Sequence, residues 1–544
     1  MVPPVLVAPE TVPPATSRGP WGWLGRLGPG GILAGAALVA VLVVLCRRVG
    51  DPDFYWHLAT GQWILDHGRL PNYELFTYTV GGHPWADQEY GSEILIALIF
   101  RGGGFLAVSL TYTAVTWAGF WLMWRRIGLE KVPPVIAAIC LLLAAAAGVA
   151  VWGPRSQMIS FALTCLTLYW VEAFLRDRHR HVYWLPALVV VWANLHGGFI
   201  YALMVVGLAA LSETILGAIG SQDPAHRRRA LRLWVVLVAS ALAALVNPHT
   251  FQVYLVTLYI EFSKVQQTFI AEWQTPSFHS AEELGLEAML LLTLAAMAIR
   301  RQRLWDVLSG MFAVYLALAA VRNASISAAL ATPLLAWAGT AAWAGTAAWA
   351  RTPWGDRFKS YVQRRAADAT FLVSVVTLAV VVGTVGFAAN TLNGQTASTD
   401  ANFPVAATDC LLANPDVGTR MLNAYDWGGY LLYRFYPQDL SPTDNRQVFI
   451  YGEATLMGNA LVQQISDVEN AEPDWQRILE ENRVDYVVER ADSALTMALS
   501  VDPQWKLVYD DGFAVILVKQ QTLDGHPWNA SAPACRAGRP SSAA

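Results

Sequence analysis

Two aspartates, Asp51 and Asp53, directly follow an apolar run that ends in "ALVAVLVVLCRR". Because they stand two residues apart, an extended segment would point both carboxylates the same way, where they could share a cation or a proton. Aspartate is also a favoured residue at the start of a helix, and a helical pattern follows. Two interpretations therefore stay open, a helix cap and a reactive carboxylate pair. They are compatible, because one acid can cap while the other reacts.

Further polar side chains stand among aromatic residues or at the ends of apolar runs. The first group, in the segment 47–102, comprises His57, His83 and Glu89. The second group comprises Arg155, Asn194, His196, His249, Glu272, Trp273 and Arg322. Arginine can hold an anion through paired N–H donors, and histidine can donate to a ligand oxygen. Structural interpretations compete with these, because arginine and tryptophan also anchor proteins at a membrane surface and glycines after a histidine can permit close helix packing.

The spacing of cysteine and histidine gives no metal-binding pattern. The five cysteines form no CxxC pair, and the histidines show neither HxxH nor HxxxH. Zinc sites commonly use such spacings, so the sequence disfavours one. Cys410 and Cys535 could instead form a disulfide if the carboxyl-terminal tail lies outside the cytosol.

The elements that must position these residues are membrane spans. Of the 544 residues, 55% are hydrophobic and 14% are charged, whereas about a quarter of a soluble domain is charged. This composition indicates an α-helical polytopic membrane protein, and a net charge of −4 gives no basic surface for nucleic acid. We expect about eleven spans. They lie near 30–46, 103–124, 133–151, 157–175, 183–195, 198–219, 231–247, 284–299, 304–321, 325–350 and 368–390.

The distribution of lysine and arginine sets the orientation of these spans. With residues 1–29 in the cytosol, the inner loops carry 18 Lys and Arg residues and the outer loops carry seven, as the positive-inside rule requires. No small-residue cleavage site follows the first apolar run, so we expect a retained helix. The bundle then spans 30–390 with a large first outer loop, 47–102. The tail, 391–544, also lies outside.

The outer segments have patterns of their own. "FYWHLATGQWIL" predicts a helix lying in the membrane interface with its aromatics at headgroup level, and "DQEYGSEILIALIF" predicts a second one leading into "RGGG" and a span. In the tail, "DWQRILEENRVDYVVER" predicts a helix followed by a short buried strand, and "WKLVYDDGFAVILVK" predicts a hairpin. We expect a small extracytoplasmic α/β domain with a disordered end over about the last twenty residues.

Together these features resemble an uncharacterised bacterial branch of the C-type (GT-C) membrane glycosyltransferase superfamily. The resemblance rests on an acid just after the first span, a long first outer loop with two helices, and several short segments. These are "DPDFYWHLATGQWI", "GGHPWADQEYGSEIL", "GPRSQ", "WANLHGGF", "VNPHT", "AEWQTP", "VRNASI" and "NAYDWGGYLL". The resemblance implies a hexosyl- or pentosyltransferase in the plasma membrane. It would move a sugar from a polyprenyl-phosphate donor to an envelope glycan, lipid or protein acceptor on the outer face.

The resemblance also implies roles for residues. Asp53, with Asp51 as the alternative, would be the catalytic carboxylate, acting as general base or helping to hold a divalent cation such as Mg or Mn. Arg155 and Arg322 would face the carrier phosphate. The remaining candidates would contact the sugar or the phosphate; they are His57, His83, Glu89, Asn194, His196, His249, Glu272 and Trp273. No WWDYG signature of oligosaccharyltransferases occurs, and "YDWGGY" at 425–430 is only superficially similar.

Two alternative functions belong to other classes. A membrane transporter or flippase would carry ionisable sites near the bilayer midplane and repeat symmetry, whereas here the polar residues gather on one face. A non-catalytic envelope-assembly protein would bind its partner through the tail, and Asp53 would then matter little.

Overall fold

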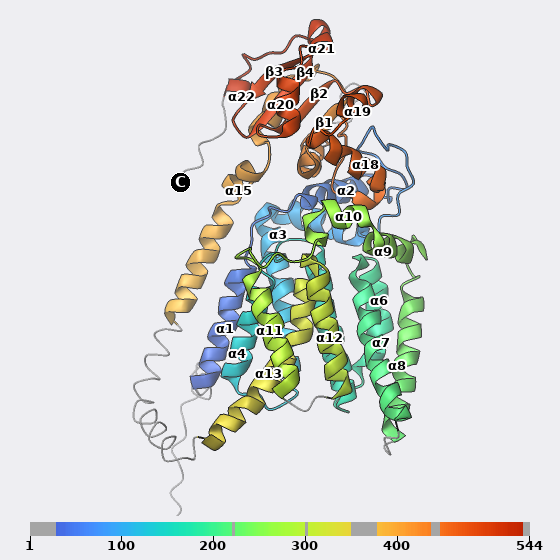
Figure 1. Ribbon diagram of the computed structural model, residues 1–544, viewed down its shortest axis with the longest axis vertical. Coiled ribbons are helices and arrows are strands. Elements are labelled where there is room, and N and C mark those ends of the chain that lie inside the picture. The colour runs from blue at the N-terminus through green and yellow to red at the C-terminus, as the bar shows by residue number, and fades with distance from the viewer. Residues whose placement is uncertain (1–28, 220–223, 300–302, 350–377, 437–445, 537–544) are drawn as a thin grey trace, which may run out of the picture.

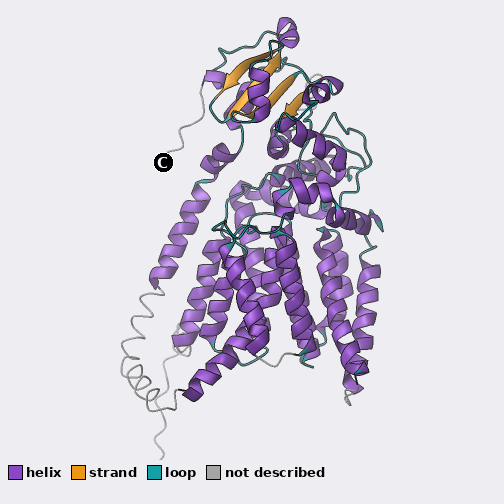
Figure 2. Cartoon of the chain, viewed as in Figure 1, coloured by secondary structure: helices purple, strands orange, loops and turns teal. Residues whose placement is uncertain are grey.

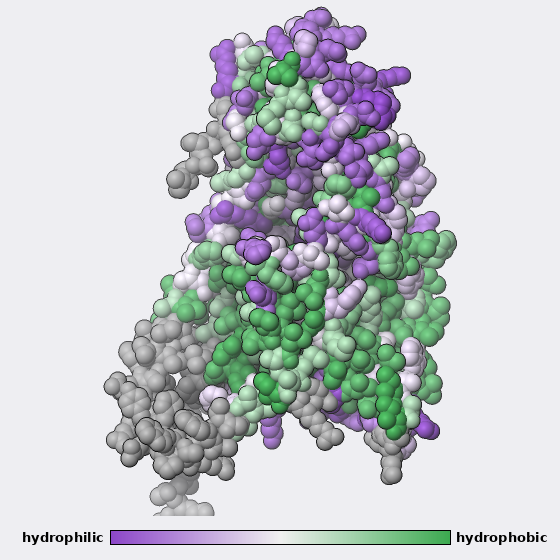
Figure 3. Space-filling view, viewed as in Figure 1, coloured by the Kyte–Doolittle hydropathy of each residue, from purple (hydrophilic) through white to green (hydrophobic). Residues whose placement is uncertain are grey.

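The computed structural model describes residues 29–219, 224–299, 303–349, 378–436 and 446–536. A bundle of long helices forms the lower part, short helices lie across one end of it, and a small sheet lies beyond them (Figure 1). The strands occur only at this far end (Figure 2). Apolar side chains cover the outside of the bundle, and polar ones cover the sheet end (Figure 3). The molecule therefore has an apolar, membrane-type part and a polar head.

The bundle helices overlap the spans expected from the sequence, with bounds that differ by several residues in places. They are α1 (Pro29–Leu45), α3 (Tyr90–Ile127), α4 (Pro134–Ala147), α5 (Gln157–Leu175), α6 (Leu185–Ala193), α7 (Ile200–Ala218), α8 (Pro224–Ala243), α11 (Leu284–Ile299), α12 (Leu304–Ala319) and α13 (Ala324–Trp349). Within the described ranges, four helical segments are long and apolar enough to cross a membrane by length and composition, and six shorter apolar helices accompany them. The last of these, Leu378–Asn393, covers part of the span expected at 368–390, and residues 368–377 lie outside the described ranges.

The two helices expected in the segment 47–102 exist, but their surroundings differ from the expectation. The first, α2 (Asp53–His67), is buried over most of its length. Its Tyr55 ring packs edge-on against Phe403 and Tyr430 of the tail. The aromatics were expected at the lipid headgroups, and that expectation is wrong because the tail covers them. The second helix is the start of α3, which is kinked at Gly103 and Gly104 before its apolar part.

The tail supplies a four-stranded sheet in the order β1-β2-β4-β3. Its strands are β1 (Met421–Asn423), β2 (Tyr486–Arg490), β3 (Trp505–Asp510) and β4 (Ala514–Lys519). β1 and β2 are parallel, and the other pairs are antiparallel. The predicted helix before a buried strand corresponds to α19 (Trp475–Glu481) and β2, and the predicted hairpin corresponds to β3 and β4. The remaining tail helices are α15 (Gln395–Asn402), α16 (Val405–Leu412), α17 (Gly428–Phe435), α18 (Ala454–Glu469), α20 (Ala494–Ser500), α21 (Gln520–Gly525) and α22 (Pro533–Arg536).

The segment 47–102 is joined to the tail by backbone and side-chain hydrogen bonds. Val448 N donates to Phe76 O at 3.2 Å, and Thr79 Oγ1 donates to Phe449 O at 2.6 Å. Thr77 and Val448 also form a parallel bridge. The polar head is therefore built jointly from two parts of the chain that lie more than 300 residues apart.

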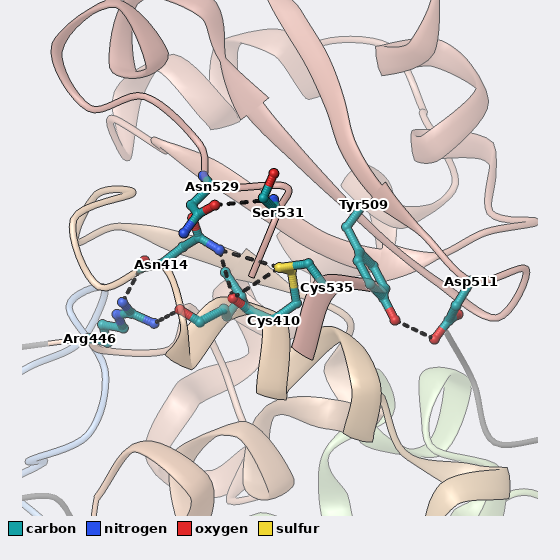
Figure 4. The surroundings of a disulfide bond; sticks show 9 residues. Cys410, Asn414, Arg446, Tyr509, Asp511, Asn529, Ser531 and Cys535 are labelled. Carbon is teal, nitrogen blue, oxygen red and sulfur yellow. Dashed lines mark hydrogen bonds between the residues drawn. A yellow bond between two sulfur atoms is a disulfide. The ribbon is translucent and has the colours of Figure 1, made fainter. Parts of the chain in front are cut away.

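A disulfide joins the end of the chain to α16. Cys410 and Cys535 are bonded, and Asn529 N donates to the Asn414 side chain at 2.7 Å (Figure 4). The expectation of disorder is therefore wrong for residues 529–536, which these contacts hold in place; residues 537–544 lie outside the described ranges. The other three cysteines are buried as free thiols.

Candidate functional site

A cavity of about 270 Å³ opens where the bundle meets the polar head. It gathers nine of the twelve residues proposed from the sequence. These are Asp51, Asp53, His57, Glu89, Arg155, His196, Glu272, Trp273 and Arg322. They come from the start of α2, the loop before α3, the start of α5, the break between α6 and α7, and the turns before α11 and α13. Segments far apart in sequence thus converge on one site.

Three proposed residues lie outside this cavity, and each has a structural reason. His83 is exposed on a turn. Asn194 directly follows α6, and its amide donates to Val190 O at 2.7 Å and to Val246 O at 2.8 Å, which ties the end of α6 to the loop after α8. His249 is half-buried beside the loop that follows α8. The interpretation of these three as ligand contacts is therefore not supported by their positions.

Asp51 forms an ion pair with Arg155 and accepts a hydrogen bond from the backbone at the start of α2. Its Oδ2 accepts from Arg155 Nε at 2.6 Å, and its Oδ1 accepts from Asp53 N at 3.1 Å. Arg155 also donates through Nη1 to Glu272 Oε1 at 2.6 Å. Burial alone would raise the pKa of Asp51, but the guanidinium of Arg155 outweighs it and holds the pKa below its ordinary value. Asp51 is therefore an ionised, fixed group.

Asp53 has the opposite environment. It is the first residue of α2, and its Oδ1 accepts from Trp56 Nε1 at 3.1 Å. Burial raises its pKa well above the ordinary value, and the negative charge of Asp51 adds to this. Gly452 of the tail approaches so closely that a Cβ there would lie 1.8 Å from Asp53 Oδ1. The two carboxyls thus divide into a permanently charged one and one that can take up a proton.

Glu89 lies between two imidazoles. Its Oε2 accepts from Ser156 Oγ at 2.5 Å, and His57 Nε2 and His196 Nε2 lie 3.7 Å and 3.6 Å from its two oxygens. Burial would raise the pKa of Glu89, but His196, His57, Ser156 and Arg322 together lower it. Burial lowers the pKa of His57. This end of the cavity therefore offers one ionised carboxylate beside two buried imidazole rings.

Arg322 offers the cavity a cation that no carboxylate neutralises. Its guanidinium lies over the Trp273 ring, 4.1 Å from the centroid. Within the described ranges, no carboxylate lies within ion-pair distance of it. Arg155, by contrast, is occupied by Asp51 and Glu272. The two arginines are therefore not equivalent, although the sequence treats them alike.

The tail contributes cavity residues that were not proposed from the sequence. Tyr425 and Asp426 come from "YDWGGY", and Glu453 comes from the start of α18. Burial, and then the charges of Glu89 and Asp87, raise the pKa of Glu453 to about 8. The polar and aromatic residues of "YDWGGY" could have suggested a functional segment, but nothing in the sequence shows that this segment folds back onto Asp53.

The donor set does not fit the divalent cation expected at Asp51 and Asp53. Asp51 is already ion-paired with Arg155, and the positive charge of that guanidinium repels a cation at the same carboxylate. Among the described residues, no group of three or more His, Cys, Asp or Glu side chains could hold a metal ion. The chemistry below is accordingly derived from the protein's own side chains.

Comparison with known proteins gives structural matches only. No family model and no curated protein matches the sequence. ArnT from Cupriavidus metallidurans bound to undecaprenyl phosphate aligns over 92% of this chain and 98% of its own, with 15% identity and a TM-score of 0.47. Its apo state aligns over 91% and 97%, with 16% identity and a TM-score of 0.49. Arabinofuranosyltransferase AftD from Mycobacteria aligns over 92% of this chain and 40% of its own, with 15% identity and a TM-score of 0.46. This chain is thus similar to these proteins along most of its length, and at these scores the similarity carries no argument about donor, acceptor or reaction.

Proposed function

We propose that this protein is an integral membrane glycosyltransferase that moves a sugar from a polyprenyl-phosphate donor to an envelope acceptor. One observation carries the proposal: the cavity joins a proton-accepting carboxyl, Asp53, to an arginine, Arg322, that forms no ion pair with any carboxylate of the described residues. The cavity lies at the end of an apolar bundle, where a lipid-borne phosphate would be presented. A soluble, nucleotide-linked donor would not need that position.

The reaction assigns one task to each end of the cavity. Asp53, when ionised, accepts the proton of the acceptor hydroxyl as the acceptor oxygen bonds to the sugar carbon. The bond between that carbon and the phosphate oxygen breaks, and its electron pair stays on the phosphate. A base with a pKa raised toward the working pH is suited to this proton transfer. Arg322 binds the leaving phosphate and stabilises the charge that develops on it.

Arg155 has a positioning role in this scheme. It holds Asp51 and Glu272 in place, and its positive charge opposes the rise in the pKa of Asp53. Asp51 in turn accepts from the backbone of Asp53 and fixes the start of α2.

The proposed topology follows from the distribution of lysine and arginine between the loops, and it determines which acceptors the cavity can reach. We place the amino terminus in the cytosol, about eleven spans in the plasma membrane, and the segment 47–102 and the tail on the outer face. The Cys410–Cys535 disulfide supports this placement, because such bonds persist in oxidising compartments. Acceptors on that face would be envelope glycans, lipids or proteins.

The test is turnover of radiolabelled polyprenyl-phosphate sugars by membranes that contain the protein. Wild type should consume at least one hexosyl or pentosyl donor, and Asp53→Asn should lose about 10²- to 10⁴-fold in rate, the usual contribution of a general base. Asp66→Asn is the matched control, because Asp66 lies on the same helix and its side chain is 53% exposed. Equal turnover by Asp53→Asn would remove Asp53 from the mechanism, and no turnover of any donor by wild type would overturn the proposal.

A further inference from the structure

The ring of His196 receives two hydrogen bonds on the same nitrogen. Gly198 N–H donates to Nδ1 at 2.8 Å, and Ser160 Oγ lies 2.9 Å from Nδ1. Ser160 Oγ itself accepts from Trp192 Nε1 at 2.8 Å, which leaves its own proton available for donation to the ring. A ring nitrogen that accepts hydrogen bonds carries no proton. The neutral ring of His196 therefore carries its proton on Nε2.

The same contacts keep this ring uncharged. A second proton on Nδ1 would face the proton of Gly198 N–H, and that hydrogen bond would be lost. Burial acts in the same direction and lowers the pKa of His196, although the Glu89 carboxylate opposes it. The other charged groups that face the ring, Arg322 and Arg155, also disfavour a second charge. His196 is therefore a fixed hydrogen-bond donor, unlike an ordinary histidine that titrates near neutral pH.

Gly198 makes this geometry possible. A Cβ there would lie 2.3 Å from Ser160 Oγ and 3.0 Å from His196 Nδ1. Any side chain at position 198 would therefore displace the hydrogen bonds that fix the ring. At Gly197, by contrast, a Cβ would meet only the end of the Gln88 side chain, which can move.

The fixed donor faces an acceptor across a short gap. His196 Nε2 lies 3.6 Å from Glu89 Oε1, which is too long for a good hydrogen bond. Both groups line the cavity. A hydroxyl placed beside them can accept from Nε2–H and donate to the carboxylate at once. A phosphate has no proton to give at neutral pH, and the ionised Glu89 repels it.

We propose that His196 and Glu89 form a subsite that binds a hydroxyl of the transferred sugar, while the carrier phosphate lies toward Arg322. The inference rests on the proposed function and makes it more specific. Neutral polyhydroxyl sugars satisfy both partners, whereas a sugar that lacks the hydroxyl leaves two buried polar groups unpaired. Such a site discriminates strongly against deoxy analogues.

The test compares two probes, undecaprenyl phosphate and undecaprenyl phosphate that carries a hexose or pentose, on the full chain in lipid nanodiscs. Wild type should bind one of the sugar-bearing forms more tightly than the bare carrier. His196→Ala should weaken that form by about 5- to 100-fold, because the buried sugar hydroxyl then lacks a donor, and should leave the bare carrier unchanged. His196→Gln, whose amide N–H can replace Nε2–H, should keep most of the difference.

The controls separate failure of this inference from failure of the proposed function. His83→Ala changes an exposed histidine outside the cavity and should alter neither affinity. Equal weakening of both probes by His196→Ala would place the phosphate at His196 and overturn the subsite. Absence of binding of either probe to wild type would overturn the proposed function.

A spectroscopic arm tests the fixed tautomer without any ligand. In protein labelled with ¹⁵N-histidine, solid-state NMR should show the His196 ring unprotonated at Nδ1 and unchanged between about pH 5 and pH 8. The signal is identified by its loss in His196→Gln. A ring that gains a proton in this range would overturn the inference by itself.

Discussion

Replacement of Arg155 should mainly lower the stability of the protein, and replacement of Arg322 should mainly lower its affinity for the ligand. Arg155 is 16% exposed and pairs with Asp51, which is 11% exposed, and with Glu272, which is 36% exposed. Removing one member of a largely buried pair costs about 3 to 5 kcal/mol, because the other charge stays buried. The pair with Glu272 contributes about 0 to 1 kcal/mol, since solvent screens it. We expect Arg155→Gln to lower the free energy of unfolding by about 3 kcal/mol, most of it from Asp51.

A double-mutant cycle isolates that contribution. The loss of stability in Arg155→Gln should arise from Asp51, which stays buried and charged without its partner. In that case, Arg155→Gln combined with Asp51→Asn should be more stable than Arg155→Gln alone by about 2 kcal/mol. Arg322→Gln orphans no carboxylate, so its cost should stay near 1 kcal/mol, the contribution of a guanidinium over a tryptophan.

The assay measures reversible unfolding in mixed micelles together with the affinity for undecaprenyl phosphate. Arg322→Gln should weaken that affinity by about 1.5 to 3 kcal/mol, as a hydrogen-bonded charge pair does. If Asp51→Asn fails to restore stability in the Arg155→Gln background, the ion pair is not what Arg155 supplies. If Arg322→Gln leaves the affinity unchanged, the phosphate lies elsewhere.

Further predictions concern stability. The pKa of Glu453 is raised to about 8 in the folded protein, so the folded state holds this proton more tightly than the unfolded state does. The free energy of unfolding of the wild type should therefore fall as the pH rises from the ordinary pKa of a glutamate to about 8. Glu453→Gln should flatten that fall, and an unchanged slope in pH-dependent unfolding would contradict the assignment. Glu172 is fully buried and contacts three arginines of the bundle, so Glu172→Gln should cost about 3 to 5 kcal/mol in the mixed-micelle assay, whereas the exposed Asp177→Asn should stay within about 0.5 kcal/mol. Cys535→Ser opens a loop of 125 residues and should cost the tail about 4 to 5 kcal/mol by the chain-entropy model, measured by proteolysis of the tail; equal resistance to protease would refute it.

The sequence predicts the parts of this site better than their assembly. Spacing and polarity identified Asp53, Glu89 and Arg322, because polar groups beside apolar runs are costly unless they are used. Helix and strand periods likewise predicted α19, β2 and the β3–β4 hairpin. These are local signals, carried by neighbouring residues.

Long-range pairing could not be predicted in the same way. The covering of α2 by the tail depends on contacts such as Tyr55 with Tyr430, which no local period encodes. The difference between Arg155 and Arg322 also depends on partners distant in sequence, since Asp51 lies 104 residues from Arg155. The order of residues 529–536 was missed for the same reason. Their composition predicts disorder, but a disulfide to a cysteine 125 residues away holds them in place.

The account depends most on the side of the membrane to which the cavity opens. His83 and Arg228 are both exposed, and they lie near opposite ends of the bundle by the proposed topology. The native cysteines are buried or disulfide-bonded, so they give little background. An impermeant maleimide applied to intact cells should label His83→Cys and should leave Arg228→Cys unlabelled until the membrane is opened. Labelling of Arg228→Cys alone would put the cavity in the cytosol and contradict a polyprenyl-phosphate donor on the outer face.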